Sequence, residues 1–403
     1  MIAPAEDREI GIRYYCTEFE GIGGRIRVRP EDFVVEELLN PRVFKPLRSG
    51  RYQVLKLIKK GMDTIHACRV VERLTGARIR YFGMKDSRSV SIQYVISDRP
   101  IEEGELTRQL RLEHVGYLDR LLGKEALFAN RFTVRIRDAN PRLFHVAELL
   151  RGEKLLNFFG YQRFGSKRPV THLIGRELVK RRFGDAVELL LGFTTDYESR
   201  KAREARALCR EGRYREALKL MPKGLDVERR VLKAILEGKG PLDALRTIPI
   251  KVRRLFVQAY QSYLFNLTLS KAIERGEDLW AVKEGDVVAE LGRWGITGIR
   301  VGGKGLPLVN LVGYGYRSRG NRLDSLTDEV LKEEGVKARD FFVDEMQEVS
   351  AQGSLRLGAL LFMDYRAEGD EVLTVRATLL KGSYMTILLR ELMKPRRPAA
   401  CGF

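Results

Sequence analysis

The sequence predicts an α+β protein in which a mainly helical block interrupts a mixed α and β domain. Three observations along the chain support this fold class. Residues 24–97 contain several short stretches that alternate apolar and polar side chains, as β-strands do. Residues 173–275 are heavily charged and follow a helical period, and strand-like alternation returns at 370–380. Strand-rich segments on both sides of a helical block favour an insertion over two domains in tandem.

The N-terminal part holds the clearest individual elements. Strands are expected within residues 24–39, with a turn at Pro30, and at 52–58. The segment "DTIHACRVVERLTG" predicts a helix, because Asp63 can cap its start and Gly76 can end it. The apolar residues on one face of this helix are Ile65, Cys68, Val71 and Leu74.

Further elements follow the same reading. A strand is expected at 130–138 and a helix at 143–150. Within the helical block, "ESRKAREARALCREGRYREALKLM" has the clearest helical period, and a short helix is expected near 325–334. The helical segment that begins at residue 253 places Phe256, Tyr260, Tyr263 and Leu267 along one stripe, which predicts core packing.

The charge of the chain indicates its partner class. The 403 residues include 73 lysines and arginines against 54 acids, a net charge of +19. The positive electrostatic field of such a chain concentrates polyanions near its surface and accelerates their binding. Nucleic acid is therefore the expected partner. A charge-rich thermophile surface would explain many charges but not this imbalance of sign.

Other classes are not indicated. No stretch approaches the roughly 20 apolar residues that span a bilayer, and the N-terminus lacks a secretory pattern. The four scattered cysteines fit a reducing cytoplasm rather than a disulfide framework. The four histidines are far apart and no metal-binding motif accompanies them, so no metal site is expected.

A single acid stands out in "YFGMKDSRSVSIQ". A strand ends at Phe82, Gly83 turns the chain, and the next strand begins near Val90, so Asp86 lies in a connection held by rigid elements. An aspartate in a loop is most often a turn former. A carboxylate nucleophile is the functional alternative, since an oxocarbenium-like transition state at a sugar anomeric carbon is stabilised by nearby negative charge. No second carboxylate stands at a recognisable spacing, so ordinary glycoside hydrolysis is not indicated.

Aromatic and basic residues alternate in "NFFGYQRFG", which includes Gln162 and Arg163. Rings beside guanidinium groups are typical of proteins that stack on unpaired RNA bases. A buried aromatic turn is the alternative, and this stretch alone does not decide between them.

Together these stretches resemble the TruD family of tRNA pseudouridine synthases, in its archaeal-like form. The pattern around the family's catalytic acid, G-x-K-D-x-x-A-x-T-x-Q, matches at Gly83, Lys85, Asp86 and Gln93. Five further segments match in order between residues 24 and 392: "RPEDFVVEE", "NRF", "NFFGYQRFG", "QAYQSYLFN" and "LKGSYMTILLREL". The sequence departs from the family patterns at Ser89, Ser91, Ala129 and Met385, where Ala, Thr, Gly and Ala are usual.

The resemblance implies a pseudouridine-synthase catalytic domain on a mixed or antiparallel sheet, formed by residues 1–157 and 346–403. The TRUD insertion domain, mainly helical α/β, would comprise residues 158–345. It also implies the reaction: uridine becomes pseudouridine in tRNA, most often at position 13, without a cofactor. Nothing in the sequence requires more than a monomer.

Site roles carry over residue by residue. Asp86 would be the nucleophile, and Arg27 would pair with it and aim it. Phe132 would stack on the extruded uracil, and Asn130 would hold the Asp86 loop or the base. The other residues assigned to substrate binding are Lys85, Gln93, Gln162 and Arg163.

Two alternatives stay open at this point. A non-catalytic RNA-binding module would explain the charge but leaves Asp86 without a task. An RNA or nucleoside N-glycosidase would use the same carboxylate and release free uracil. A pseudouridine synthase acting on another RNA or another tRNA position is a further alternative, and the sequence does not choose between addition at C1′ and a glycal route.

Overall fold

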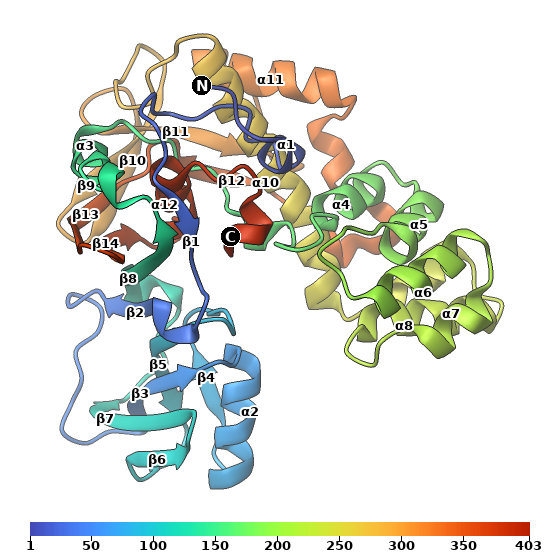
Figure 1. The fold of residues 1–403 in the computed structure, drawn as a ribbon, viewed down its shortest axis with the longest axis horizontal. Helices are drawn as coiled ribbons and strands as arrows, with labels where there is room; N and C mark the ends of the chain where they lie inside the picture. The colour runs from blue at the N-terminus through green and yellow to red at the C-terminus, as the bar shows by residue number, and fades with distance from the viewer.

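The computed structural model describes residues 1–403, with the side chain of Lys124 left out. Its described strands form one ten-stranded sheet and one four-stranded sheet, surrounded by helices (Figure 1). The strands are β1 (Gly23–Arg25), β2 (Phe33–Leu39), β3 (Tyr52–Lys60), β4 (Ile79–Tyr81), β5 (Val90–Ser97), β6 (Gly104–Thr107), β7 (Leu110–Leu118), β8 (Leu127–Ala139), β9 (Val287–Gly292), β10 (Gly295–Val301), β11 (Leu306–Leu311), β12 (Ser354–Leu357), β13 (Phe362–Glu368) and β14 (Leu373–Leu380). The α-helices are α1 (Ala5–Glu9), α2 (Thr64–Thr75), α3 (Val146–Leu149), α4 (Thr171–Val179), α5 (Phe183–Gly192), α6 (Arg200–Arg210), α7 (Tyr214–Leu220), α8 (Asp226–Leu236), α9 (Pro241–Arg246), α10 (Ile250–Glu274), α11 (Arg322–Glu334) and α12 (Met385–Met393).

The large sheet joins the two ends of the chain. Its order is β13-β14-β8-β2-β5-β3-β7-β6, with β1 added beside β8 and β4 beside β5. Only β2 and β5 pair in parallel among the described strands, and every other pair is antiparallel. The central strand β8 lies between β2 and β14, which are separated by most of the sequence. The predicted α+β fold class is confirmed.

The four-stranded sheet was not foreseen from the sequence. Its order is β10-β9-β11-β12, and its first three strands come from the glycine-rich stretch after α10. The last strand, β12, follows residue 345 and pairs with β11. This sheet therefore crosses the expected boundary between the insertion and the catalytic domain, and the division stays a prediction.

Helices α4–α9 form a helical lobe to one side of the large sheet, and the long helix α10 runs between the lobe and the rest of the molecule (Figure 1). The side chains predicted to form the α10 stripe pack in the core: Phe256, Tyr260 and Leu267 are buried, and Tyr263 is partly buried against them. The lobe has its own hydrophobic core, which α10 shares.

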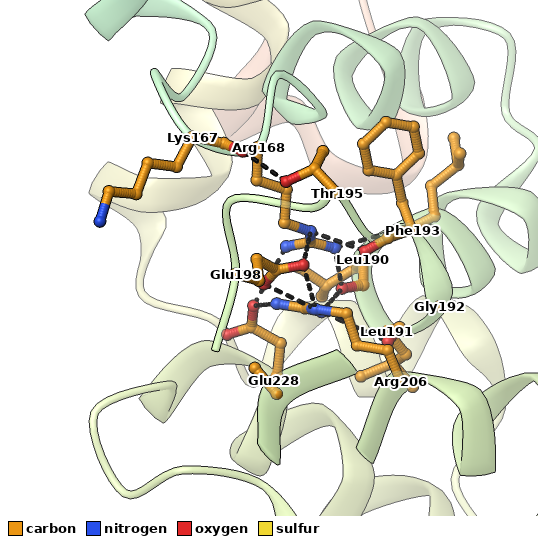
Figure 2. Close-up of polar contacts among 12 residues, drawn as sticks. Lys167, Arg168, Leu190, Leu191, Gly192, Phe193, Thr195, Glu198, Arg206 and Glu228 are labelled. Atoms are coloured by element: carbon orange, nitrogen blue, oxygen red, sulfur yellow. Dashed lines mark hydrogen bonds and ion pairs between the residues drawn. The ribbon is translucent and has the colours of Figure 1, made fainter. Parts of the chain in front are cut away.

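A buried ionic network connects the helices of this lobe (Figure 2). Arg206 of α6 lies between two carboxylates, with Nε 2.9 Å from Glu198 Oε1 and Nη2 2.9 Å from Glu228 Oε1. Arg168 donates to Glu228 at 3.2 Å and to the carbonyl of Phe193 at 2.8 Å. Arg206 also donates to the carbonyl of Leu190. The last carbonyl groups of α5 have no N–H donors within the helix. The two arginines donate hydrogen bonds to them instead.

Two local expectations are corrected. The expected helix at 143–150 is α-helical only at Val146–Leu149, with tight 3₁₀ turns on either side. Helix α2 begins after its Asp63 cap and ends at Gly76 as expected, but Ile65 and Leu74 are exposed. The other two residues of that face, Cys68 and Val71, are buried and pack with Ala67 against the sheet. No described helix combines the length and apolar character that a membrane crossing requires.

Candidate active site

The loop between β4 and β5, residues 82–89, opens onto a cavity of about 450 Å³. We call these the Asp86 loop and the Asp86 cavity. The cavity brings together seven of the eight site residues expected from the sequence, from four separate parts of the chain: Arg27, Lys85, Asp86, Asn130, Phe132, Gln162 and Arg163. Its size lies within the range of small-molecule sites. Asp86 is therefore neither buried nor turned away from a space that admits a nucleoside.

A larger hollow of about 880 Å³ lies at the far end of α4. Its Arg181 donates to the carbonyls of Val179, Asp340 and Phe342, so this cation already has protein partners. The smaller cavity is the better candidate because it has an available carboxylate beside aromatic and amide side chains.

Asp86 and Arg27 form an unequal ion pair. Nη2 of Arg27 lies 3.2 Å from Oδ2 of Asp86, and the two side chains are 6% and 50% exposed. The buried guanidinium stacks 4.1 Å above the Phe33 ring and donates from Nη1 to the carbonyl of Gly402. Burial lowers the pKa of Arg27 to about 10, against the opposing attraction of Asp86. Arg27 thus stays a cation at neutral pH and fixes one oxygen of a carboxylate that solvent can reach.

The turn Tyr161–Arg163 covers Arg27 from the other side. With its oxygen turned toward Arg27, the Gln162 amide accepts hydrogen bonds from Nη1 at 2.7 Å and from Nη2 at 2.8 Å. Arg163 donates from Nε to the hydroxyl of Ser262 on α10 at 3.0 Å. These contacts connect a segment of the expected insertion to the ion pair.

Asn130 and Phe132 extend from one face of β8, since residues two apart on a strand point the same way. They lie opposite Glu37 and Val35 of β2. Phe132 meets the Phe33 ring edge-on, with centroids 5.9 Å apart. Oδ1 of Asn130 is buried and has no hydrogen-bond partner among the described residues. Such an atom is available to a ligand that enters the cavity.

Lys85 and Gln93 lie differently from the other predicted residues. Nζ of Lys85 donates to Oε1 of Glu37 at 2.7 Å, and both side chains are largely buried. Gln93 is fully buried below the loop, where it donates to the carbonyl of Gly83 and accepts from Thr64. These contacts favour a role in holding the loop, and substrate contact by Lys85 or Gln93 stays a prediction.

Several participants were not singled out from the sequence. Glu37 orders Lys85 and also accepts from the backbone of Tyr94. Thr64 accepts from the backbone nitrogen of Lys85 at 2.8 Å. Ser383 and Tyr384, just before α12, and Met385 and Thr386, at its start, also line the cavity; of these four the sequence had drawn attention only to Met385, as a departure from the family pattern. Glu37 and the α12 residues lie within segments that resemble family motifs, which was the available signal; Thr64 had none.

Among the described residues, no group of three or more histidine, cysteine or acidic side chains is arranged to hold a metal ion. The cavity's polar lining instead includes one exposed carboxylate, three cations, two amides and five hydroxyl side chains. This set can bind an anionic, hydrogen-bonding ligand and place one nucleophilic oxygen against it.

Comparison with known proteins gives a consistent assignment. The family described as tRNA pseudouridine synthase D (TruD) matches residues 9–392. The chain belongs to the TruD family. Its predicted membership is confirmed, and so is the predicted enzyme class, an isomerase.

Individual TruD relatives match over most of their length. "Probable tRNA pseudouridine synthase D" of Pyrobaculum islandicum is 34% identical over 418 residues, covering 100% of this chain and 99% of the relative. The protein of the same name from Methanopyrus kandleri is 36% identical, covering 89% and 90%. A crystal structure from Methanosarcina mazei, described as tRNA pseudouridine synthase D, has a TM-score of 0.78 at 28% identity, covering 98% of this chain and 99% of that one.

Proposed function

We propose that this chain converts uridine to pseudouridine in tRNA, with position 13 as the target. The observation that carries the proposal is the half-exposed Asp86 carboxylate, held by buried Arg27 and facing a cavity lined by Phe132 and Asn130. Membership of the TruD family and the names of its relatives support the substrate class. The net charge of +19 supports a polyanionic partner.

The reaction is an isomerisation and needs no external oxidant or reductant. The N1–C1′ bond of uridine breaks, the uracil turns, and C5 bonds to C1′; C5 then loses its proton and N1 ends with one. Asp86 either adds through an oxygen to C1′ or takes a proton from C2′ to give a glycal. In the proposal no metal or cofactor takes part.

The surrounding residues serve capture and orientation. A stacked uridine must leave its helix first, at a cost of a few kcal/mol. Phe132 would stack on the freed base, and the unpartnered oxygen of Asn130 would accept from it. Arg27 and Gln162 would keep the carboxylate aimed. Arg163, at the cavity wall, would attract neighbouring phosphates, and Lys85, paired with Glu37, would hold the loop at the edge of the substrate site.

The domain division belongs to the same proposal. Residues 1–157 and 346–403 would form the catalytic domain and 158–345 the insertion. Gln162 and Arg163 come from the insertion side yet line the same cavity as Asp86. Substrate would therefore bind where the two parts meet, and a monomer acting in the cytoplasm would suffice.

The test is to incubate purified protein with an unmodified tRNA transcript and to map pseudouridine chemically. A single new pseudouridine at position 13 is the expected result. Release of free uracil would indicate an N-glycosidase instead. Tight RNA binding without conversion at any position would indicate a binding module.

A further inference from the structure

Lys59 of β3 is a fully buried charge that the mechanism above does not use. Its Nζ donates to the carbonyl of Met62 at 2.7 Å and to the carbonyl of Asp86 at 3.0 Å. The carbonyl of Lys85 and the hydroxyl of Ser91 lie farther, at 3.4 and 3.3 Å. No carboxylate of the described residues lies within ion-pair distance of this ammonium. A buried charge without a partner of opposite sign is costly, and such groups concentrate at functional sites.

A second donor acts on the same carbonyl. Ser89 donates from Oγ to the carbonyl of Asp86 at 2.9 Å and lies 3.1 Å from the hydroxyl of Ser91, which Lys59 also reaches. Both serines are buried. Ser89 stands where the family pattern has alanine, which has no hydroxyl to donate. In this chain the backbone of the catalytic residue is therefore held by an ammonium and a hydroxyl together.

We propose that Lys59 is a positioning residue for Asp86. Its ammonium holds the Lys85 and Asp86 carbonyls and places positive charge beneath the carboxylate, with Ser89 as an additional donor. The inference rests on the proposed function, because it assigns Lys59 a task in the same reaction. It differs from a purely structural role in that the charge of Lys59, and not only its bulk, sets the rate.

The environment of Lys59 makes this charge pH-dependent. Burial lowers the pKa of Lys59 to about 8, while Asp86 of the loop and Asp63 before α2 raise it. Lys85 of the loop lowers it further, and Cys68 of α2 faces it as the remaining titratable group. Below pH 8 Lys59 is an ammonium with three protons to donate. Above pH 8 it becomes an amine that has lost one proton and its charge, so the hold on the loop weakens as pH rises.

The experiment compares the wild type with Lys59→Met, which keeps an unbranched side chain one atom shorter and removes the charge, and Ser89→Ala, which restores the family residue. Lys60→Met is the matched control, because Lys60 is the next residue of the strand, is exposed and pairs with Glu31 at the surface. Single-turnover rates at saturating tRNA are measured from pH 6 to 9.5, together with tRNA affinity. Hydrogen exchange of the amides in residues 83–91 is measured without RNA.

Lys59→Met should lower the rate at pH 7 by roughly 30-fold or more, as displaced catalytic groups do, with tRNA affinity within about threefold. The wild-type rate should fall above pH 8, and the Lys59→Met profile should lack this fall when the same RNA is used. Ser89→Ala should lose about threefold to tenfold, and Lys60→Met should match the wild type. Loop amides should exchange faster in Lys59→Met.

Wild-type rates in Lys59→Met, or the same alkaline fall in both proteins, would overturn the inference. If Lys59→Met does not fold, a wild-type rate that stays flat from pH 7 to 9.5 or a fully active Ser89→Ala would overturn it. A wild type that never forms pseudouridine would refute the proposed function instead. In that case unchanged loop exchange in Lys59→Met would still overturn the positioning claim, and faster exchange would support it.

Discussion

In the helical lobe, Arg168 and Arg206 face Glu198 and Glu228, two cations against two carboxylates. Around the Asp86 loop the balance is different. Arg27 and Lys85 each have one carboxylate, and Lys59 has only carbonyls and a hydroxyl. Both regions use buried cations to hold backbone carbonyls. The ionic network of the lobe and the Asp86 site differ in whether their own polar groups are all satisfied.

The lobe network leaves the guanidinium groups of its arginines paired, whereas Nε of Arg27 and Oδ1 of Asn130 lack partners among the described residues. A satisfied buried network stabilises one geometry, and removing one member leaves a buried charge uncompensated. A site with unpaired buried polar groups can form hydrogen bonds to a ligand, and these unpaired groups lower the stability of the free protein. Changes in the lobe should therefore affect stability, and changes at the cavity should affect rate.

The largest effect is expected from Asp86→Asn. The amide keeps the shape of the side chain but is not a nucleophile, so the rate of tritium release from 5-tritiated uridine in tRNA should fall by roughly 10⁴-fold, about 5 kcal/mol of barrier. Affinity for tRNA should stay within several-fold, and the urea midpoint should match the wild type. The control is Asp98→Asn, in a turn outside the cavity. Sustained tritium release by Asp86→Asn would remove its assigned role.

Arg206→Met should produce the reverse pattern. It leaves Glu198 and Glu228 in the lobe with only Arg168, and the expected loss in free energy of unfolding is about 3 kcal/mol. The rate per folded molecule should be unchanged. Urea denaturation measures the loss, and Arg213→Met, which breaks an exposed pair with Glu216, should leave the midpoint where it was. A variant as stable as the wild type would show that the network is not a stabilising one.

Phe132→Ala should show a smaller loss, located in base capture. Stacking on a base is worth about 1–3 kcal/mol, so the single-turnover efficiency should fall by about 10- to 100-fold. Since Phe132 also packs on Phe33, Phe132→Leu is needed as a variant that keeps apolar bulk. If Phe132→Ala captured substrate at the wild-type rate, another residue would perform the stacking.

The smallest expected difference is in the free energy of unfolding, between alanine variants of two equally buried methionines. Met221 in the lobe core and Met385 at the cavity are both 2% exposed. Met221→Ala should lower the free energy of unfolding by about 2–5 kcal/mol, as closed cores do. Met385→Ala restores the residue usual in the family and opens space that water can fill, so about 1–2 kcal/mol is expected. Equal losses in urea denaturation would mean that Met385 is packed like a closed core.

Much of this was accessible from the sequence because it depends on local patterns. Alternation located the strands around Asp86, and Asp63 and Gly76 marked both ends of α2. The second sheet was missed because its first three strands lie in a stretch interrupted by glycines, which is typical of loops. The exposed Ile65 and Leu74 show that apolar spacing identifies a helix more reliably than the face it buries.

The site was predictable where a motif carries it and not where partners meet only in space. Asp86 lies in a motif and Arg27 lies two residues before one, and their contact joins residues 59 positions apart. Lys59 and Arg206 resemble many other basic residues in a basic sequence. Only the tertiary structure shows that these two are buried while most lysines and arginines face solvent.

The pairing of β8 with β14 has a consequence for biosynthesis. Residues 127–139 leave the ribosome long before residues 373–380, so one side of β8 has no neighbour while α4–α11 are being made. An open strand edge pairs readily with other chains, so the nascent chain is exposed to aggregation during this interval. Arg27 also lacks one of its hydrogen-bond acceptors, the carbonyl of Gly402, until the last residues of the chain have been synthesised, because the two residues are 375 positions apart. Catalytic competence is thus acquired late, and a nascent chain cannot modify RNA before the intervening lobe has been synthesised.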